Sequence, residues 1–366
     1  MKAKIFILLF IVLLTGCDVS GKGVNDRAIV ERIGIDYEDG VYVISLKILP
    51  YEDGGTEEEN DNAHGSREIT ELIVRGSTVN EAIVNSITYL KKSPYFAHLD
   101  NIIISKEVAS TGIGSLIDYF NRNVEFRKST VVYLSKEKAS DIIFKSTNQL
   151  NSSDLMEKIE GEGVNSETVF YAMLLDISKI FADNMSDLVL PVLDLQDVKD
   201  KALQVSVIKE AAVFKDDTLS YTIPSSMIRS ILLLNNALKH DNYTLNTEKH
   251  GKISIYLENC DINTKVKTID NQPVFDIKIE SVLLIKEIEK NYKETPSKDD
   301  LNEITEAYNK LIREEINKCI DECLHKNKSD IFGISEKLKM KSVKEYEKLK
   351  YNIYDSKINL ELNTKL

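Results

Sequence analysis

Reactive chemistry in this sequence centres on one cysteine near its beginning. The segment Leu14-Thr15-Gly16-Cys17 follows two lysines and an apolar run from Ile5 to Leu14. A deprotonated thiol is a strong nucleophile, and small residues directly before a cysteine are typical of a lipoprotein signal. In such a signal the sulfur receives a diacylglyceryl group before a peptidase cuts the chain. The sequence therefore predicts lipid attachment at Cys17 and cleavage between Gly16 and Cys17.

The apolar run is too short to be a membrane span. It has ten residues, whereas a transmembrane helix needs about 20. We expect residues 1–16 to be a signal peptide and residues 17–26 to be a lipidated tether, with lipid as the only membrane attachment. Two acyl chains, at about 0.8 kcal/mol per buried CH₂, anchor a protein stably. The expected covalent group is a diacylglycerol, with an N-acyl chain as an optional second lipid, and no other cofactor.

Three further cysteines remain, at Cys260, Cys319 and Cys323. Cys319 and Cys323 are four residues apart on one side of a predicted helix, so a metal or redox pair is one interpretation. Both also fall in the apolar stripe of that helix, where a free cysteine acts as a small apolar side chain. No third or fourth ligand lies nearby in the sequence, which favours the core interpretation and no metal site.

A search for catalytic motifs finds none. The sequence has no His-Glu-x-x-His zinc motif, phosphate-binding loop or Gly-x-Ser-x-Gly elbow, and Gly112-Ile113-Gly114-Ser115 is best interpreted as a helix start. His98 precedes a predicted strand, and a structural role is favoured over a base or pH sensor. Two acids and two arginines could form an anion clamp, namely Glu107, Arg122, Glu125 and Arg127. Ordinary ion pairs are the favoured interpretation of these residues. We therefore expect no enzymatic activity and no catalytic residues.

Charge limits the partners that the chain can bind. Its net charge is −12, and removal of Lys2 and Lys4 with the signal peptide makes it −14. Binding to phosphates requires a basic surface, and no cluster of Lys and Arg is visible along the sequence. Composition thus argues against nucleic-acid or anionic-lipid binding. The 42% apolar content is ordinary for a globular protein.

The 350 residues after the predicted cleavage site exceed the usual size of one domain. We expect two to three domains of α+β class, with mixed or antiparallel sheets packed with helices. An N-terminal α/β-type domain is predicted over 27–198, with a subdivision near 145–165. A C-terminal α+β domain is predicted over 202–366, with a long helix at 299–325. The acidic segment 51–67 is predicted to be a mobile surface loop.

Apolar periodicity places the individual elements. A Glu-Asp-Gly turn at 38–40 predicts a hairpin between strands at 28–36 and 41–48. Further strands are expected at 69–74, 101–105, 130–134, 188–195, 205–209, 211–219 with a central Asp-Asp turn, 253–257, 265–268, 274–285 and 357–362. Helices are expected at 79–90, at 113–120, after the strand at 130–134 to about residue 144, at 169–181 and at 228–238. The long helix has one apolar stripe, which includes Ile304, Tyr308, Leu311 and Ile312.

Several short motifs in this order resemble the Ger(x)C family, the C subunits of Ger-type spore germinant receptors. The matching stretches are 25–30 leading to 34–36, 97–105, 118–127, 212–216 and 329–333. Each stretch is short, but their order, their spacing and the lipoprotein signal are specific together. The family's usual Trp-Asp-Arg-Arg-Glu after the lipidated cysteine is replaced here by residues 18–24.

The resemblance implies a non-enzymatic, lipid-anchored protein on the outer face of the spore's inner membrane. It also implies multispanning A and B subunits as partners, a role in the response to germinants, and no tightly bound small molecule. The alternative from another class is the solute-binding lipoprotein of a membrane importer. Such proteins have two lobes of repeating strand–helix units around a cleft, a pattern that this sequence lacks.

Overall fold

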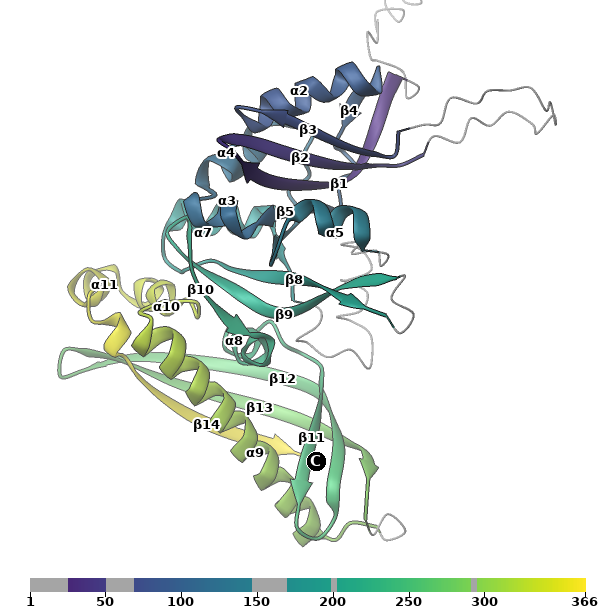
Figure 1. Cartoon of the computed structure of the whole chain (residues 1–366). Coiled ribbons are helices and arrows are strands. Elements are labelled where there is room, and N and C mark those ends of the chain that lie inside the picture. The colour runs from purple at the N-terminus through teal and green to yellow at the C-terminus, as the bar shows by residue number, and fades with distance from the viewer. Residues whose placement is uncertain (1–25, 51–68, 147–169, 199–202, 291–294) are drawn as a thin grey trace, which may run out of the picture.

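The computed structural model describes residues 26–50, 69–146, 170–198, 203–290 and 295–366. Within these residues the chain forms one large sheet and one four-stranded sheet, both packed with helices (Figure 1). A long helix lies on the second sheet. This arrangement confirms the predicted α+β class. Gly16, Cys17 and the acidic segment 51–67 lie outside the described residues.

The described strands of the first sheet have the order β10-β9-β8-β6-β5-β1-β2-β3, with β4 beside β1 and β7 beside β6. Their bounds are β1 (Arg27–Glu38), β2 (Val41–Ile48), β3 (Glu71–Gly76), β4 (Ser93–Tyr95), β5 (Asn101–Ser105), β6 (Val131–Ser135), β7 (Ala172–Met173), β8 (Val189–Asp197), β9 (Gln204–Lys215) and β10 (Thr218–Pro224). The predicted hairpin of the first two strands is confirmed. Asp39 and Gly40 form its turn, both with positive φ, as a tight two-residue hairpin turn requires.

Helices pack on both faces of this sheet. They are α2 (Val79–Leu90), α3 (Lys106–Thr111), α4 (Gly114–Arg122), α5 (Ala139–Lys145) and α7 (Leu174–Asp183). One apolar core contains residues of α2, α3, α4 and α7 together with Ile102 and Ile104 of β5. Ile103 points to the opposite face and packs in a second core with α5. Alternate side chains of one buried strand therefore serve two layers, as the period of a strand requires.

The centre of the sheet is parallel. Strands β1, β5, β6 and β8 run in one direction, and each crossover between them contains helices. The amino ends of these strands thus meet at one edge of the sheet and their carboxyl ends at the other. The predicted helix at 169–181 begins later than expected, at Leu174. The short helix α3 was not predicted.

The predicted boundary near 197–201 lies between two paired strands. β8 and β9 are antiparallel neighbours from Val189 opposite Val213 to Asp197 opposite Gln204. The first sheet therefore continues to Pro224, where β10 ends. The chain then passes through η3 (Ser225–Met227) and α8 (Ile228–Leu234) before it enters the second sheet.

The second sheet has the order β11-β12-β13-β14, with β11 (Asp241–Thr247), β12 (Gly251–Ile269), β13 (Gln272–Ile288) and β14 (Lys357–Lys365). The prediction of two strands at 253–257 and 265–268 was wrong, because one long strand covers both. Its register against β13 shifts between Leu257 and Asn259, and this irregularity interrupts the apolar alternation. β11 was not predicted.

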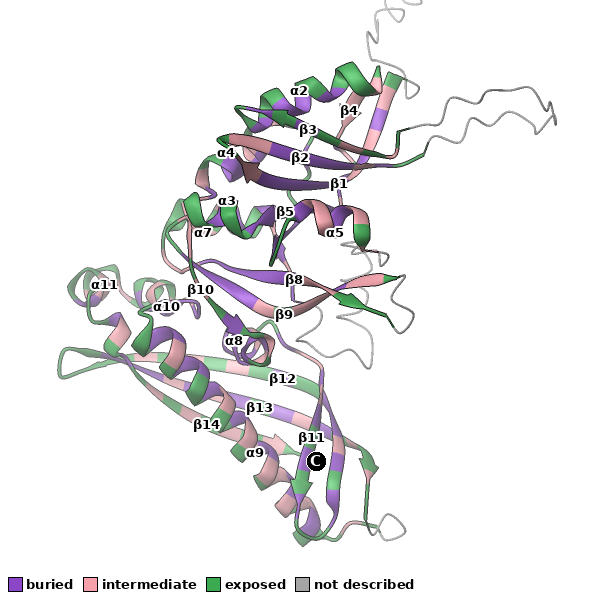
Figure 2. Cartoon of the chain, viewed as in Figure 1, coloured by how far each residue is buried: buried purple, intermediate pink, exposed green. Residues whose placement is uncertain are grey.

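The predicted long helix is confirmed as α9 (Lys298–Ile320), which continues as the π-helical turn η4 (Asp321–Lys326). Ser297 and Asp300 form a capping box at its start. Its buried stripe faces the second sheet (Figure 2), and Ile312 is 1% exposed, whereas Leu311 is only half-buried. The remaining helices are α10 (Ile334–Lys341), α11 (Val343–Leu349) and η5 (Ile353–Asp355).

The core beneath α9 extends into the first sheet. It contains Ile312 of α9, Ile231 of α8 and Ile279 of β13, and also Ala211 and Val213 of β9. Helix α8 lies between the two sheets (Figure 1). The face of β8 and β9 that points toward α8 and the second sheet is therefore buried by the C-terminal half of the chain.

Candidate functional site

The cysteine pair of the long helix lies in the core. Cys319 and Cys323 are buried free thiols, and Cys260 is also buried and free. A hydrogen bond between the two helix thiols, helped by burial, raises the pKa of Cys319, and the same bond lowers the pKa of Cys323. Among the residues that the structure describes, no group of three or more His, Cys, Asp or Glu is placed to hold a metal ion.

The residues considered for an anion clamp do not meet. Glu107 lies in α3, just after the carboxyl end of β5, whereas Arg122 and Arg127 lie near the amino ends of the parallel strands. Arg122 instead pairs with Asp118 at 2.6 Å, one helical turn away. His98 is exposed rather than buried, and its ring lies 6.1 Å from that of Tyr95.

The carboxyl edge of the parallel strands forms a hollow of about 740 Å³. Ligands of α/β sheets commonly bind at this edge. Two of its carboxylates already have partners: Asp36 accepts hydrogen bonds from the N–H groups of Ala139 (2.7 Å) and Ser140 (3.0 Å). Glu38 accepts from Lys138 at 2.6 Å and from Arg75 at 3.1 Å. Burial raises the pKa of Asp36, whereas the two cations lower that of Glu38. The edge is thus mainly a self-paired structural network.

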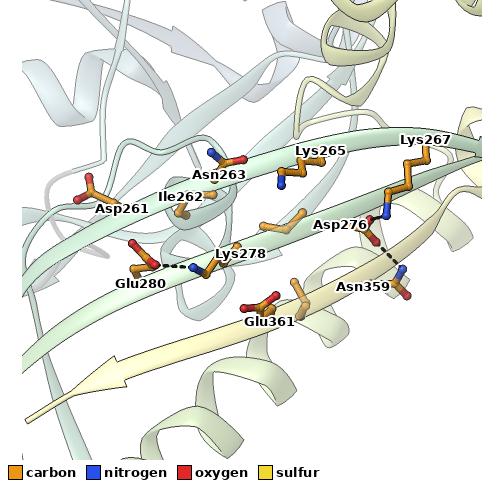
Figure 3. Close-up of a pocket in the computed structure, with 12 residues that line it drawn as sticks. Asp261, Ile262, Asn263, Lys265, Lys267, Asp276, Lys278, Glu280, Asn359 and Glu361 are labelled. Atoms are coloured by element: carbon orange, nitrogen blue, oxygen red, sulfur yellow. Dashed lines mark hydrogen bonds and ion pairs between the residues drawn. The ribbon is translucent and has the colours of Figure 1, made fainter.

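A second hollow, of about 640 Å³, lies on the polar face of the four-stranded sheet (Figure 3). Its side chains come from β12, β13 and β14, on the face opposite to α9. Lys267 contacts Asp276 at 2.5 Å, and Asn359 donates to the same carboxylate at 2.8 Å. These two partners lower the pKa of Asp276, with Asn359 the stronger cause.

Two carboxylates face each other across this hollow. Asp261 on β12 lies directly opposite Glu280 on β13. Like charges in such positions destabilise a sheet unless cations offset them. Lys239 contacts Asp261 at 3.1 Å, and Lys278 contacts Glu280 at 2.6 Å. The hollow is therefore a charged, internally balanced surface.

The edge of the same sheet is partly protected. β14 is the last strand in the order, and strands at an edge leave backbone groups unpaired by other strands. Arg313 of α9 donates to the carbonyl of Leu360 at 3.0 Å, and Thr364 donates to the side chain of Asn309 at 2.6 Å. The long helix thus occupies part of this edge as well as the apolar face.

A polar junction joins the two halves of the chain. Lys215, at the end of β9, lies 3.2 Å from Asp187 and donates to the carbonyl of Lys328 at 3.2 Å and to the hydroxyl of Tyr354 at 3.1 Å. Asp187 and Asp330 exchange two hydrogen bonds: the N–H of Asp330 donates to the Asp187 carboxylate (2.8 Å), and the N–H of Asp187 donates to the Asp330 carbonyl (2.9 Å).

The two charged partners of this junction respond differently to their surroundings. Burial raises the pKa of Asp187, although Lys215 opposes that shift. The pKa of Lys215 is also raised, because its acceptors outweigh the effect of its own burial. The ammonium group, with four acceptor atoms, is the better satisfied partner. The Asp187 carboxylate depends on Lys215 for a neighbouring positive charge.

This junction was not predicted as a site. Two of the family-like motifs meet there, the one at 212–216 through Lys215 and the one at 329–333 through Asp330. The carboxylate of Asp330 also accepts from the N–H groups of Ile334 (2.8 Å) and Ser335 (2.7 Å), which begin α10. The sequence signal is an aspartate before a helix, but the residues that complete the junction, Asp187 and Lys215, are more than 100 residues away from 328–330.

Comparison with known proteins identifies the class to which this fold belongs. The profile of the spore germination protein N-terminal domain matches residues 20–195, and the profile described as spore germination B3/GerAC-like, C-terminal, matches residues 209–366. Together the profiles define a two-part spore germination protein. The chain belongs to the Ger(x)C family, as the resemblance implied.

Individual relatives agree with this assignment. The chain is 24% identical to spore germination protein KC of Bacillus subtilis, over 94% of this chain and 89% of that protein. It is 25% identical to YfkR of the same organism, which is named as a spore germination protein, over 90% of this chain and 85% of the relative. The crystal structure of the GerBC protein has the same fold, with a TM-score of 0.58, 14% identity and coverage of 91% and 96% of the two chains.

Proposed function

We propose that this protein is a lipid-anchored, non-enzymatic subunit of a spore germinant receptor and is needed for the response to a germinant. It would lie on the outer face of the spore's inner membrane and work with multispanning A and B subunits. The observation that carries the proposal is the match of both halves of the chain to spore germination domains. The lipoprotein signal before Cys17 supports it.

Anchoring through Cys17 accounts for membrane attachment in this proposal. Among the described residues, no helix is both long and apolar enough to cross a membrane. A diacylglycerol on Cys17, with or without an N-acyl chain, would hold the protein at the surface essentially permanently.

Binding to neighbouring proteins fits the surface better than binding to a solute. Four carboxylates of the two hollows are engaged by cations or by backbone N–H groups, namely those of Asp36, Asp261, Asp276 and Glu280. We therefore expect no tight small-molecule ligand. The importer alternative requires two lobes around a cleft, whereas the described residues share one core between two sheets.

The anchor is tested by Cys17→Ala, with Ser20→Ala as the matched control. After cell fractionation in a strain without the A and B subunits, the alanine variant should be released from membranes and the control retained. The removal of the partners excludes retention through protein contacts, and deletion of residues 2–14 from the alanine variant, downstream of a separately cleaved secretion signal, excludes retention through the apolar run. Sedimentation of the alanine variant with membranes at high salt would reject lipid-only anchoring.

The receptor role is tested by deletion of the gene. Spores should fail to respond to one germinant but still germinate with agents that bypass receptors, and the A and B subunits should copurify with the protein. Titration of the purified protein with amino acids, sugars and nucleosides should show no tight binding. Submicromolar solute affinity together with normal germination of the deletion strain would favour the importer alternative.

A further inference from the structure

We propose that the amino edge of the parallel strands is the surface that lies on the bilayer and binds anionic lipid headgroups. This inference rests on the proposed lipid anchor at Cys17. The surface, here called the tether-side edge, comprises six basic residues and the loops that carry them: Arg27, Lys91, Lys92, Arg122, Arg127 and Lys128. Composition argued against anionic lipid, but the fold brings together basic residues that are distant in the sequence.

The position of the anchor points to this edge. Arg27 is the first residue of β1, and only nine residues separate it from Cys17. A chain of that length spans at most roughly 30 Å even when fully extended. The surface near the start of β1 must therefore stay close to the lipid. Figure 1 shows the start of β1 beside β4 at one end of the molecule, with α10 and α11 at the opposite side of the view.

Ring contacts hold the loops of this edge together. The guanidinium of Arg27 lies 4.3 Å from the centre of the Tyr95 ring. The next residue, Phe96, packs against Phe126 with ring centres 4.7 Å apart. Thr130, after that loop, donates a hydrogen bond of 3.1 Å to the carbonyl of Leu99. The loop between α4 and β6 is thus fixed beside the start of the chain's first strand.

Two loops of this edge are basic, although the acidic segment 51–67 connects β2 to β3 at the same edge. Residues 91–100 and 121–130 contain five basic and two acidic residues, in a chain of net charge −12. Arg122, Arg127 and Lys128 are all exposed. One of them, Arg122, pairs with Asp118, and Lys128 donates to the side chain of Asn121 at 2.7 Å. Clustered Lys and Arg at a membrane surface are attracted to anionic lipids.

An apolar side chain projects from the centre of the basic loop. Val124 is 98% exposed, although the neighbouring Phe126 is buried. Tyr89, near the end of α2 and close to Lys91 in the chain, is 59% exposed. Basic residues combined with exposed apolar and aromatic side chains are typical of surfaces that sit at the membrane interface. Lipid is therefore the occupant that explains charge, apolar exposure and tether position together.

The chain provides a matched control at its other side. The α10–α11 region is also rich in lysine, and Tyr351 beside it is 81% exposed. Cysteines can be introduced at either place as V124C or Y351C and labelled with bimane, because Cys260, Cys319 and Cys323 are buried. The full mature lipoprotein would be reconstituted into vesicles that contain lipids with nitroxide-labelled headgroups.

In phosphatidylglycerol vesicles, bimane on V124C should be quenched several-fold more strongly than bimane on Y351C. The preference should fall in phosphatidylcholine vesicles, at high salt, and in the double variant Arg122→Glu/Arg127→Glu. The control double variant Lys106→Glu/Lys344→Glu reverses the same amount of charge on exposed residues elsewhere and should keep it. Unchanged melting temperatures would show that both variants fold.

Three results would overturn the proposal. The first two are equal quenching at the two positions and stronger quenching at Y351C. The third is stronger quenching at V124C that requires the A and B subunits and does not depend on lipid charge, because this result would indicate a protein contact. Failure of the anchor itself is separable, because a protein without lipid on Cys17 would not float with phosphatidylcholine vesicles at high salt. In that case, labelled V124C protein should still bind phosphatidylglycerol vesicles at low salt, and no change in its emission would reject the surface.

Discussion

The backbone N–H of Gly114 donates a hydrogen bond of 3.0 Å to the carboxylate of Asp217, and the adjacent N–H of Ile113 donates to the carbonyl of the same aspartate at 2.8 Å. These bonds fasten the start of α4 to the turn between β9 and β10. Elements 103 residues apart are joined here. A Cβ atom on Gly114 would lie 2.7 Å from the Asp217 carboxylate, so this contact requires glycine.

We expect Gly114→Ala to destabilise the protein by about 1–3 kcal/mol, because the added methyl group forces the Asp217 carboxylate away from the N–H of residue 114. Chemical denaturation would measure the loss. Ser115→Ala, at the next and exposed position, is the control and should change stability little. Equal stability of the two variants would mean that the turn moves without cost.

Lys215→Met should weaken the polar junction between the two halves. The half-buried Asp187 would lose its cation, at a cost of about 1–3 kcal/mol. The same substitution at the exposed Lys209, on the same strand, is the matched control. Thermal unfolding of both variants checks the prediction, which fails if their midpoints coincide.

Ile312→Ala should lower the free energy of unfolding by about 2–5 kcal/mol, because Ile312 is fully packed under the second sheet. The sequence places Leu311 in the same apolar stripe, yet Leu311 only packs against the margin of that core. We therefore expect Leu311→Ala to cost less, and Lys310→Ala, which is exposed, to cost least. A different order in denaturant titrations would contradict the assigned face of α9.

Asp300→Asn should produce a stability difference that depends on pH. Lys249, and after it Ser297, hold the pKa of Asp300 well below its unfolded value of 3.8. A lowered folded-state pKa contributes stability above pH 3.8 that is lost as pH falls through the folded pKa. At neutral pH the variant should therefore melt a few degrees below the parent, and the gap should narrow below about pH 4.

Melting curves of parent and variant between pH 2 and pH 7 test this. Asp299→Asn, the neighbouring substitution, should follow the parent across the range. A gap that stays constant or widens on acidification would assign the role of Asp300 to packing rather than to its charge.

Local signals in the sequence predicted much of the fold. The Asp39-Gly40 turn, the alternating β2 strand and the Ser297 cap of the long helix each depend on residues close together in the chain. β12 was divided wrongly because a register shift after Leu257 breaks the alternation on which the prediction depended. Periodicity does not detect a bulge that is stabilised by a neighbouring strand.

Contacts between distant residues could not be predicted in the same way. Neither the Lys215–Asp187 pair nor the tether-side edge is visible along the sequence, because each combines segments that only the sheet order brings together. The anion clamp, which ranked below ordinary ion pairs as an interpretation of Glu107 and Arg122, does not form for the same reason. Glu107 and Arg122 are close in sequence but lie toward opposite ends of parallel strands.

Strand β9 has a consequence for how this protein can be divided. Ala212 and Phe214 belong to the core of the first sheet, whereas Ala211 and Val213 belong to the core that α9 covers. The second family profile begins at residue 209, inside this strand. A gene fragment cut at the profile boundary would split β9 and leave an open apolar face on both products. The segment that a single family profile matches is thus smaller than the unit that folds. Either half can be exchanged between relatives only if β9, which both cores share, is transferred with it.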